Sequence, residues 1–164
     1  MLDTSIYGKL VEDTRLMNNI NEKRKSNQFV IYGTSIIRKE LRATPKDAFY
    51  GAKKLRILLL NLYDNFITKE NQDLKVNKLV EALSNDYFLE YKKNKGNLSN
   101  ESIINDFMII ATATIYQLDV IVSDDERSML SDKAVKSFKN VNKEYGLKDP
   151  KFKKYSQFRI ELTR

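Results

Sequence analysis

The sequence LDVIVSDDERSM, at residues 118–129, is the part of the chain from which the expected fold follows. Leu118, Val120, Ile121 and Val122 form a short apolar and largely β-branched run, which is typical of a buried strand. Ser123, Asp124 and Asp125 follow at the point where such a strand would end. In open α/β sheets, ligands bind beside the carboxyl ends of the parallel strands. The stretch therefore predicts a buried parallel strand that presents acidic side chains to a binding site.

The composition is that of one helix-rich globular domain. The chain has 164 residues, of which 41% are hydrophobic and 31% charged, with 5 glycines and 2 prolines. A chain of this length buries a substantial core, and this composition argues against long disordered tracts. We expect residues 1–164 to form a single domain, with a helical segment at 45–97 and a basic part at 129–164.

Cysteine and histidine are both absent, which limits the possible chemistry. Without cysteine there are no disulfides and no thiolate metal sites, and without histidine there is no Ser-His-Asp triad and no histidine-bound zinc. Hydrolysis would have to use carboxylates, lysine, tyrosine, hydroxyls or an oxygen-bound cation. No apolar stretch approaches the roughly 20 residues of a membrane span, and the N-terminus lacks the basic region of a secretion signal. We expect a cytoplasmic protein without a membrane partner.

The net charge of +7 is concentrated at one end of the chain. Residues 129–164 carry ten basic and four acidic side chains, a balance of +6, whereas the first 128 residues carry only +1. A basic region on a nearly neutral body favours a polyanionic partner such as RNA, although a solvated lysine-rich surface would have the same composition. Lys133, Lys136 and Lys139 are the candidate contacts to a nucleic-acid backbone.

Two further acids fall on helix faces that should be buried. Glu40 lies three residues after Ile37 on one short helix, and Asp106 lies three residues after Ile103 on another. A carboxylate on a core-facing stripe is costly unless it is paired or bound to a cation. For Glu40 a salt bridge with an arginine and a metal site are equally good interpretations, whereas for Asp106 a metal ligand is favoured.

The remaining pattern predicts alternating strands and helices. Met1–Asp3 and Phe29–Tyr32 are short strand candidates, and Phe158–Leu162 alternates as an edge strand would. Apolar residues recur at helical spacing in four longer segments, which we expect to be helices, at 48–67, 73–93, 100–117 and 131–145.

Taken in order, these features resemble the PIN-domain ribonucleases. That family has an Asp after its first strand, a Glu on an early helix, an Asp opening a helix of small residues, and a Ser/Thr-x-Asp after its fourth strand. Asp3, Glu40 and Asp106 match the first three positions, and Ser123-Asp124-Asp125 matches the last, with Asp125 in the acidic position.

The resemblance implies a three-layer α/β/α domain with a central, mainly parallel sheet and an acidic pocket that binds Mg²⁺ or Mn²⁺. It implies that Asp3, Glu40, Asp106 and Asp125 are the catalytic metal ligands, that Asp124 is an alternative ligand, and that Thr4, Ser5 and Ser123 support them. The activity implied is endoribonuclease cleavage of RNA. The toxin members of the family pair as homodimers and are held inactive by an antitoxin protein, so both partners are expectations for a toxin of this kind.

Two other functions remain open. The same fold could be an inactive RNA-binding module whose acids form ion pairs with Arg38, Arg42 or Arg127. An aspartyl phosphohydrolase would also place an Asp after its first strand, but it needs a second Asp where this chain has Ser5.

Overall fold

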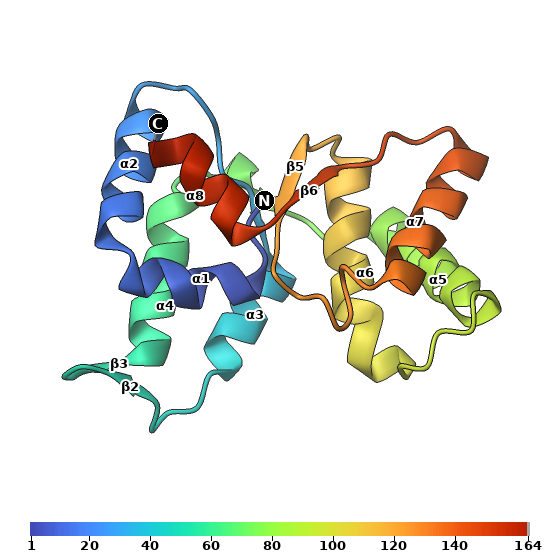
Figure 1. Cartoon of the computed structure of the whole chain (residues 1–164), viewed down its shortest axis with the longest axis horizontal. Coiled ribbons are helices and arrows are strands. Elements are labelled where there is room, and N and C mark those ends of the chain that lie inside the picture. The colour runs from blue at the N-terminus through green and yellow to red at the C-terminus, as the bar shows by residue number, and fades with distance from the viewer. Residues whose placement is uncertain (164) are drawn as a thin grey trace.

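A computed structural model describes residues 1–163 as a mixed α/β protein that is mostly helical (Figure 1). Its helices are α1 (Thr4–Glu12), α2 (Thr14–Lys25), α3 (Ser35–Ala43), α4 (Leu55–Phe66), α5 (Lys78–Lys93), α6 (Asn100–Ile115), α7 (Asp132–Tyr145) and α8 (Tyr155–Thr163). Its strands are β1 (Gly33–Thr34), β2 (Phe49–Tyr50), β3 (Lys53–Lys54), β4 (Asp73–Leu74), β5 (Val120–Val122) and β6 (Lys151–Lys153), and a 3₁₀ turn covers Glu70–Gln72.

The strand predicted at 118–122 is present as β5, and it is paired on both sides. β6 runs parallel to it, with Ile121 opposite Phe152. On the other side Leu2 forms a parallel bridge with Val122, whose N–H donates to the carbonyl of Met1 at 3.0 Å. Because these segments are parallel, the residues that follow Leu2 and Val122 emerge at the same end.

Helices lie on both sides of these strands (Figure 1). Helices α1 to α4 and α8 gather on one side, and α5, α6 and α7 pack together on the other. The buried face of α6 includes Ile103, Phe107 and Ile110, all fully buried, as the spacing predicted. Helix α3 contacts both α4 and α6 and so touches both groups of helices. No helix within residues 1–163 combines the length and apolar character that crossing a membrane requires.

Four predicted elements differ from the structure. The helix expected at 73–93 begins only at Lys78, because Asp73–Leu74 forms strand β4. The helix expected at 48–67 begins only at Leu55, because β2 and β3 form an antiparallel hairpin around a turn at Gly51. The edge strand expected at Phe158–Leu162 is part of α8, and the strand that pairs at that edge is β6, at Lys151–Lys153. The segment Phe29–Tyr32 is extended chain that leads into β1, whose two residues pair in parallel with β4.

Candidate metal and active site

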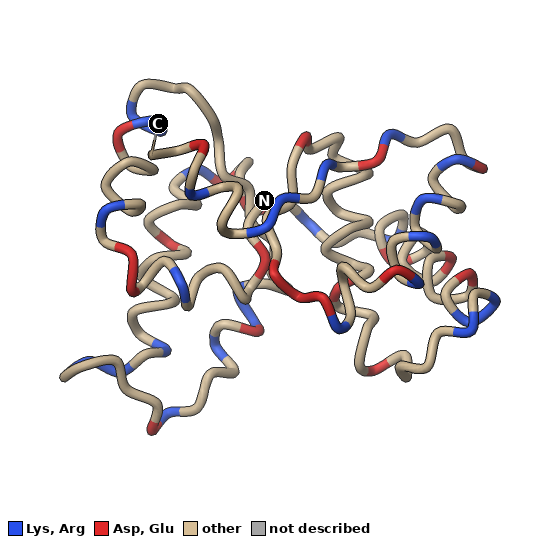
Figure 2. Tube along the Cα trace, in the orientation of Figure 1, with Lys and Arg blue, Asp and Glu red and all other residues tan. Residues whose placement is uncertain are grey.

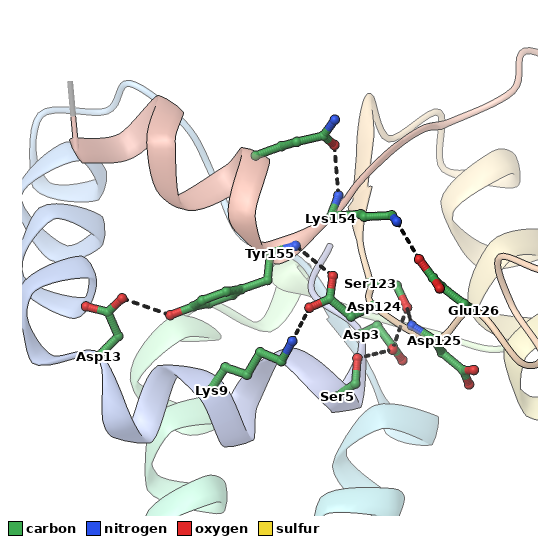
Figure 3. Close-up of polar contacts among 11 residues, drawn as sticks. Asp3, Ser5, Lys9, Asp13, Ser123, Asp124, Asp125, Glu126, Lys154 and Tyr155 are labelled. Carbon is green, nitrogen blue, oxygen red and sulfur yellow. Dashed lines mark hydrogen bonds and ion pairs between the residues drawn. The ribbon is translucent and has the colours of Figure 1, made fainter.

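Asp3 is buried at the junction of Leu2 and helix α1, with 5% of its surface exposed. It is the N-cap of α1, and its carboxylate accepts the Thr4 N–H at 2.7 Å. The same carboxylate accepts the hydroxyl of Ser5 at 2.7 Å and that of Ser123 at 2.8 Å (Figure 3). Both serines were predicted as supporting residues, and each orients this carboxylate.

Asp125 lies beside Asp3 because Ser123 connects the two. The Ser123 hydroxyl donates to Asp3 and accepts the N–H of Asp125 at 3.1 Å. The Asp125 carboxylate accepts the N–H of Ser128 at 3.1 Å and also the Ser128 hydroxyl. The turn after β5 is therefore built around Asp125, and it fixes that side chain relative to the end of the strand.

Glu40 reaches the same region from α3. One of its oxygens accepts the Thr4 hydroxyl at 2.5 Å, and the other accepts the side-chain amide of Asn105 at 2.9 Å. Thr4 is next to Asp3, and Asn105 is next to Asp106. These two hydrogen bonds place Glu40 between the first helix and α6, and the Thr4 contact matches its predicted supporting role.

Asp106 lies on α6 and is partly buried. The pKa of its carboxyl is raised from 3.8 to about 7, mainly by burial, while the Ser128 hydroxyl lowers it. The negative charges of Asp3, Asp125 and Glu40 also contribute to the rise. Hydrogen bonds through Thr4, Ser123 and Asn105 also connect these segments, so four carboxylates that are distant in the sequence lie in one region. Figure 2 shows acidic residues gathered where the two groups of helices meet.

Asp124 is directed away from the other acids. Its carboxylate forms an ion pair with Lys9 on α1 and accepts the N–H of Tyr155 at 2.9 Å (Figure 3). Burial would raise the pKa of Asp124, but the Lys9 ammonium and the Tyr155 N–H outweigh it and hold that pKa below its usual value. Asp124 therefore links β5 to α1 and α8, and Asp125 is the member of the pair that faces the cluster.

Among residues 1–163, the four carboxylates have none of the arginine partners that an inactive module would provide. Within residues 1–163, Asp3, Glu40, Asp106 and Asp125 form no ion pair with lysine or arginine. Arg38, which could have neutralised Glu40, pairs with Asp64 at 3.1 Å. The donors to the four acids come instead from hydroxyl, amide and backbone groups, which leaves the negative charge of the cluster uncompensated.

The oxygen atoms of these carboxylates are the type of ligand that a hard divalent cation prefers. In the part of the chain that the structure describes, no group of three or more acidic side chains is arranged so that it could hold a metal ion. Mg²⁺ does not require such a cage, because it keeps several waters and is commonly bound by one or two carboxylates together with substrate phosphates. Burial is the main cause of the raised pKa of Asp106, and the neighbouring carboxylates add a repulsion that a cation would relieve.

The lysines predicted to contact nucleic acid lie on α7. Lys133, Lys136 and Lys139 are all exposed, and Lys133 donates to the carbonyl of Lys95 at 2.6 Å, at the turn that follows α5. Helix α7 packs on α5, so these side chains belong to the α5–α7 part of the molecule.

Two residues of the site were not predicted from the sequence. Asn105 orients Glu40, and Ser128 orients Asp125 while also lowering the pKa of Asp106. The sequence gives a weak signal for Ser128, because an aspartate side chain often accepts hydrogen bonds from residues two or three positions later in a turn. Asn105 had no such signal, since its role depends on α3 and α6 being in contact.

Comparisons with known proteins identify no relative. No protein-family model matches the chain, and neither a curated protein nor a solved structure matches it.

Proposed function

We propose that this protein is a Mg²⁺- or Mn²⁺-dependent endoribonuclease whose active site consists of Asp3, Glu40, Asp106 and Asp125. The observation that carries the proposal is the clustering of four carboxylates without a basic partner among residues 1–163, three of which raise the pKa of the fourth. A protein that needed only a stable fold would pair or remove such charges. We also propose that the short parallel strands and the helices beside them form a three-layer, PIN-like arrangement.

In this proposal the four acids have different roles in binding the cation and orienting water. Asp3 and Asp125, held by serine hydroxyls, would hold the cation together with water and a substrate phosphate, and Asp106 would add negative charge beside it. Glu40, oriented by Thr4 and Asn105, would orient an attacking water. A bound divalent cation supplies charge stabilisation for a phosphodiester and lowers the pKa of water, which the acids alone cannot do.

The test is cleavage of single-stranded RNA by the purified protein. We expect cleavage with Mg²⁺ or Mn²⁺ and none in EDTA. Asp3→Asn, Glu40→Gln, Asp106→Asn and Asp125→Asn should each lower the rate by about 100-fold or more, and combined substitutions should be non-additive because the acids act as one unit. Asp124→Asn is the matched control, since it removes a neighbouring carboxylate that faces Lys9.

Cleavage that survives in EDTA or in Asp106→Asn would contradict the assignment and indicate a contaminating nuclease. Metal-independent RNA binding without any cleavage would favour the inactive RNA-binding module instead.

A further inference from the structure

The hairpin formed by β2 and β3 is an exposed element that the proposed active site does not use. It leaves the body of the protein directly after α3, the helix that carries Glu40, and projects from it (Figure 1). Its two strands pair Phe49 with Lys54 and Tyr50 with Lys53 around a turn at Gly51, where φ is +57°. A glycine suits this position because other residues rarely adopt a positive φ.

Both faces of the hairpin carry an aromatic ring beside a lysine. Adjacent residues of a strand point to opposite faces, and paired residues share a face. Phe49 and Lys54 therefore lie on one face, and Tyr50 and Lys53 on the other. Phe49 is 58% exposed, Tyr50 is 44% exposed, and both lysines are exposed. The rings contribute nothing to the core, although their sequence spacing had suggested a core helix.

The charge around the hairpin is strongly positive. Residues 42–56 contain five basic side chains and one acid, Asp47, a balance of +4. Within residues 1–163, none of these five basic groups forms an ion pair. The basic residues are Arg42, Lys46, Lys53, Lys54 and Arg56. An element with unpaired cations and exposed rings is complementary to an anionic ligand that has flat faces.

We infer that the β2–β3 hairpin binds single-stranded RNA, with bases stacked on Phe49 and Tyr50 and phosphates contacted by Lys53 and Lys54. Stacking on aromatic side chains and phosphate contacts with lysine are the two interactions by which proteins hold single strands without reading their sequence. In duplex RNA the bases are stacked on one another, so their faces are not available to the rings. The inference rests on the proposed function, and it names the substrate class and the element that holds it.

The position of the hairpin is consistent with holding a strand for cleavage. Glu40 lies three residues before the end of α3, and Phe49 follows that end after a short connection. A strand bound at the hairpin would therefore be held by the segment that directly follows the helix carrying Glu40.

The experiment measures binding separately from cleavage. Anisotropy of a labelled uridine oligomer of about 12 nucleotides is recorded in EDTA, so that no metal-dependent cleavage occurs. Phe49→Leu/Tyr50→Leu keeps apolar side chains but removes the rings, and we expect Kd to rise about tenfold or more. Phe49→Trp/Tyr50→Trp keeps the rings and should bind at least as tightly as wild type. The same oligomer in a duplex should bind more weakly to the wild type and be insensitive to either change.

A matched pair of lysine variants separates local contact from overall charge. Lys53→Ala/Lys54→Ala and Lys136→Ala/Lys139→Ala each remove two exposed positive charges, one pair from the hairpin and one from α7. We expect the hairpin pair to weaken binding more and to reduce the dependence of log Kd on log salt by about 1.4, the value for two phosphate contacts on a single strand.

Several results would overturn the inference. The inference fails if the leucine variants bind like wild type, if Lys53→Ala/Lys54→Ala binds like wild type, or if the wild type does not bind the oligomer. A wild-type dimer that becomes monomeric in the leucine variant with RNA binding unchanged would make the hairpin a contact between copies of the chain. The proposed function fails separately: hairpin-dependent binding without cleavage supports the inference and refutes the nuclease.

Discussion

Asp106 has a pKa of about 7 in the folded protein, against 3.8 for an ordinary aspartate. The folded state therefore holds a proton between these two values that the unfolded chain has lost. Because the folded state binds more protons, its stability falls as the pH rises from about 4 to about 7, and the loss is complete above that range. Ionisation of Asp106 therefore destabilises the metal-free protein at neutral pH.

Asp106→Asn should remove this dependence on pH. We expect the metal-free variant to be more stable than wild type at about pH 8, with a difference in unfolding free energy that grows by about 3 kcal/mol from about pH 4.5. Urea denaturation of both proteins in EDTA at the two pH values measures it. A difference that does not change with pH would mean that burial and the neighbouring acids do not hold Asp106 in its protonated form.

Asp124 and Asp125 provide a contrast between adjacent residues. Asp125→Asn should abolish cleavage, whereas Asp124→Asn should retain most of the activity and lose less than about 1 kcal/mol of stability, because its ion pair with Lys9 is partly exposed. Cleavage rates and thermal melts of the two variants test this. Exchanged phenotypes would mean that Asp124 is the ligand.

The sequence alone could not separate these two acids. Both follow β5, and the alternation of side chains says only that neighbours point in different directions. The choice depends on Lys9 and Tyr155, which come from α1 and α8 and lie far away in the sequence. Only the folded chain brings them beside Asp124.

The connection from β1 to α3 is an element whose packing can be tested through a glycine. Gly33 is buried, and a Cβ at this position would lie 2.3 Å from the Tyr63 hydroxyl, which bonds to Asp73 at 2.9 Å. Gly33→Ala should therefore destabilise the protein by about 1–3 kcal/mol, because the ring or the strand must move. Urea denaturation of the variant measures the loss.

Gly8→Ala is the matched control for that change. Gly8 lies within α1, and a Cβ there would meet nothing within 4 Å. Alanine is the better helix former, so the same substitution should raise stability by about 0.5–1 kcal/mol. If both variants lose stability equally, the Tyr63 contact does not limit the size of residue 33.

The elements that could be predicted are those whose sequence allows one interpretation. Helices α6 and α7 follow their apolar spacing, with cap residues at Ser99 and Ser131. The hairpin at 49–54 was missed because Phe49 was grouped with the apolar residues of the following helix, although it lies six residues before Leu55, and nothing in the sequence shows that this ring is exposed. Phe158 and Leu162 are four residues apart as well as alternating with polar residues, so they fit a helix and a strand equally.

On the scale of the whole molecule, the four acids belong to segments spread along the chain, at positions 3, 40, 106 and 125. The rule that parallel strands end at the same edge predicts that Asp3 and Asp125 meet, and the bridge between Leu2 and Val122 confirms the pairing. The contact of α3 with α6, which brings Glu40 to Asp106, follows from packing of the two groups of helices. Sequence spacing could suggest that each acid faces inward, but not which acids would be neighbours.

Because α3 and α6 belong to different groups of helices, a cation at the cluster would join both parts of the molecule and stabilise the whole fold. Binding to the folded state alone adds about 2.7 kcal/mol at a concentration 100 times Kd, which for a chain of this size raises Tm by about 5–10 °C. We expect Mn²⁺ to raise the Tm of wild type and of Asp124→Asn, and to leave that of Asp106→Asn nearly unchanged. Melts with and without Mn²⁺, with NaCl added to match ionic strength, measure the shift. An equal rise in the Tm of Asp106→Asn would mean that the metal binds elsewhere. If millimolar Mn²⁺ does not raise the Tm of wild type, the folded protein does not bind the cation in the absence of substrate.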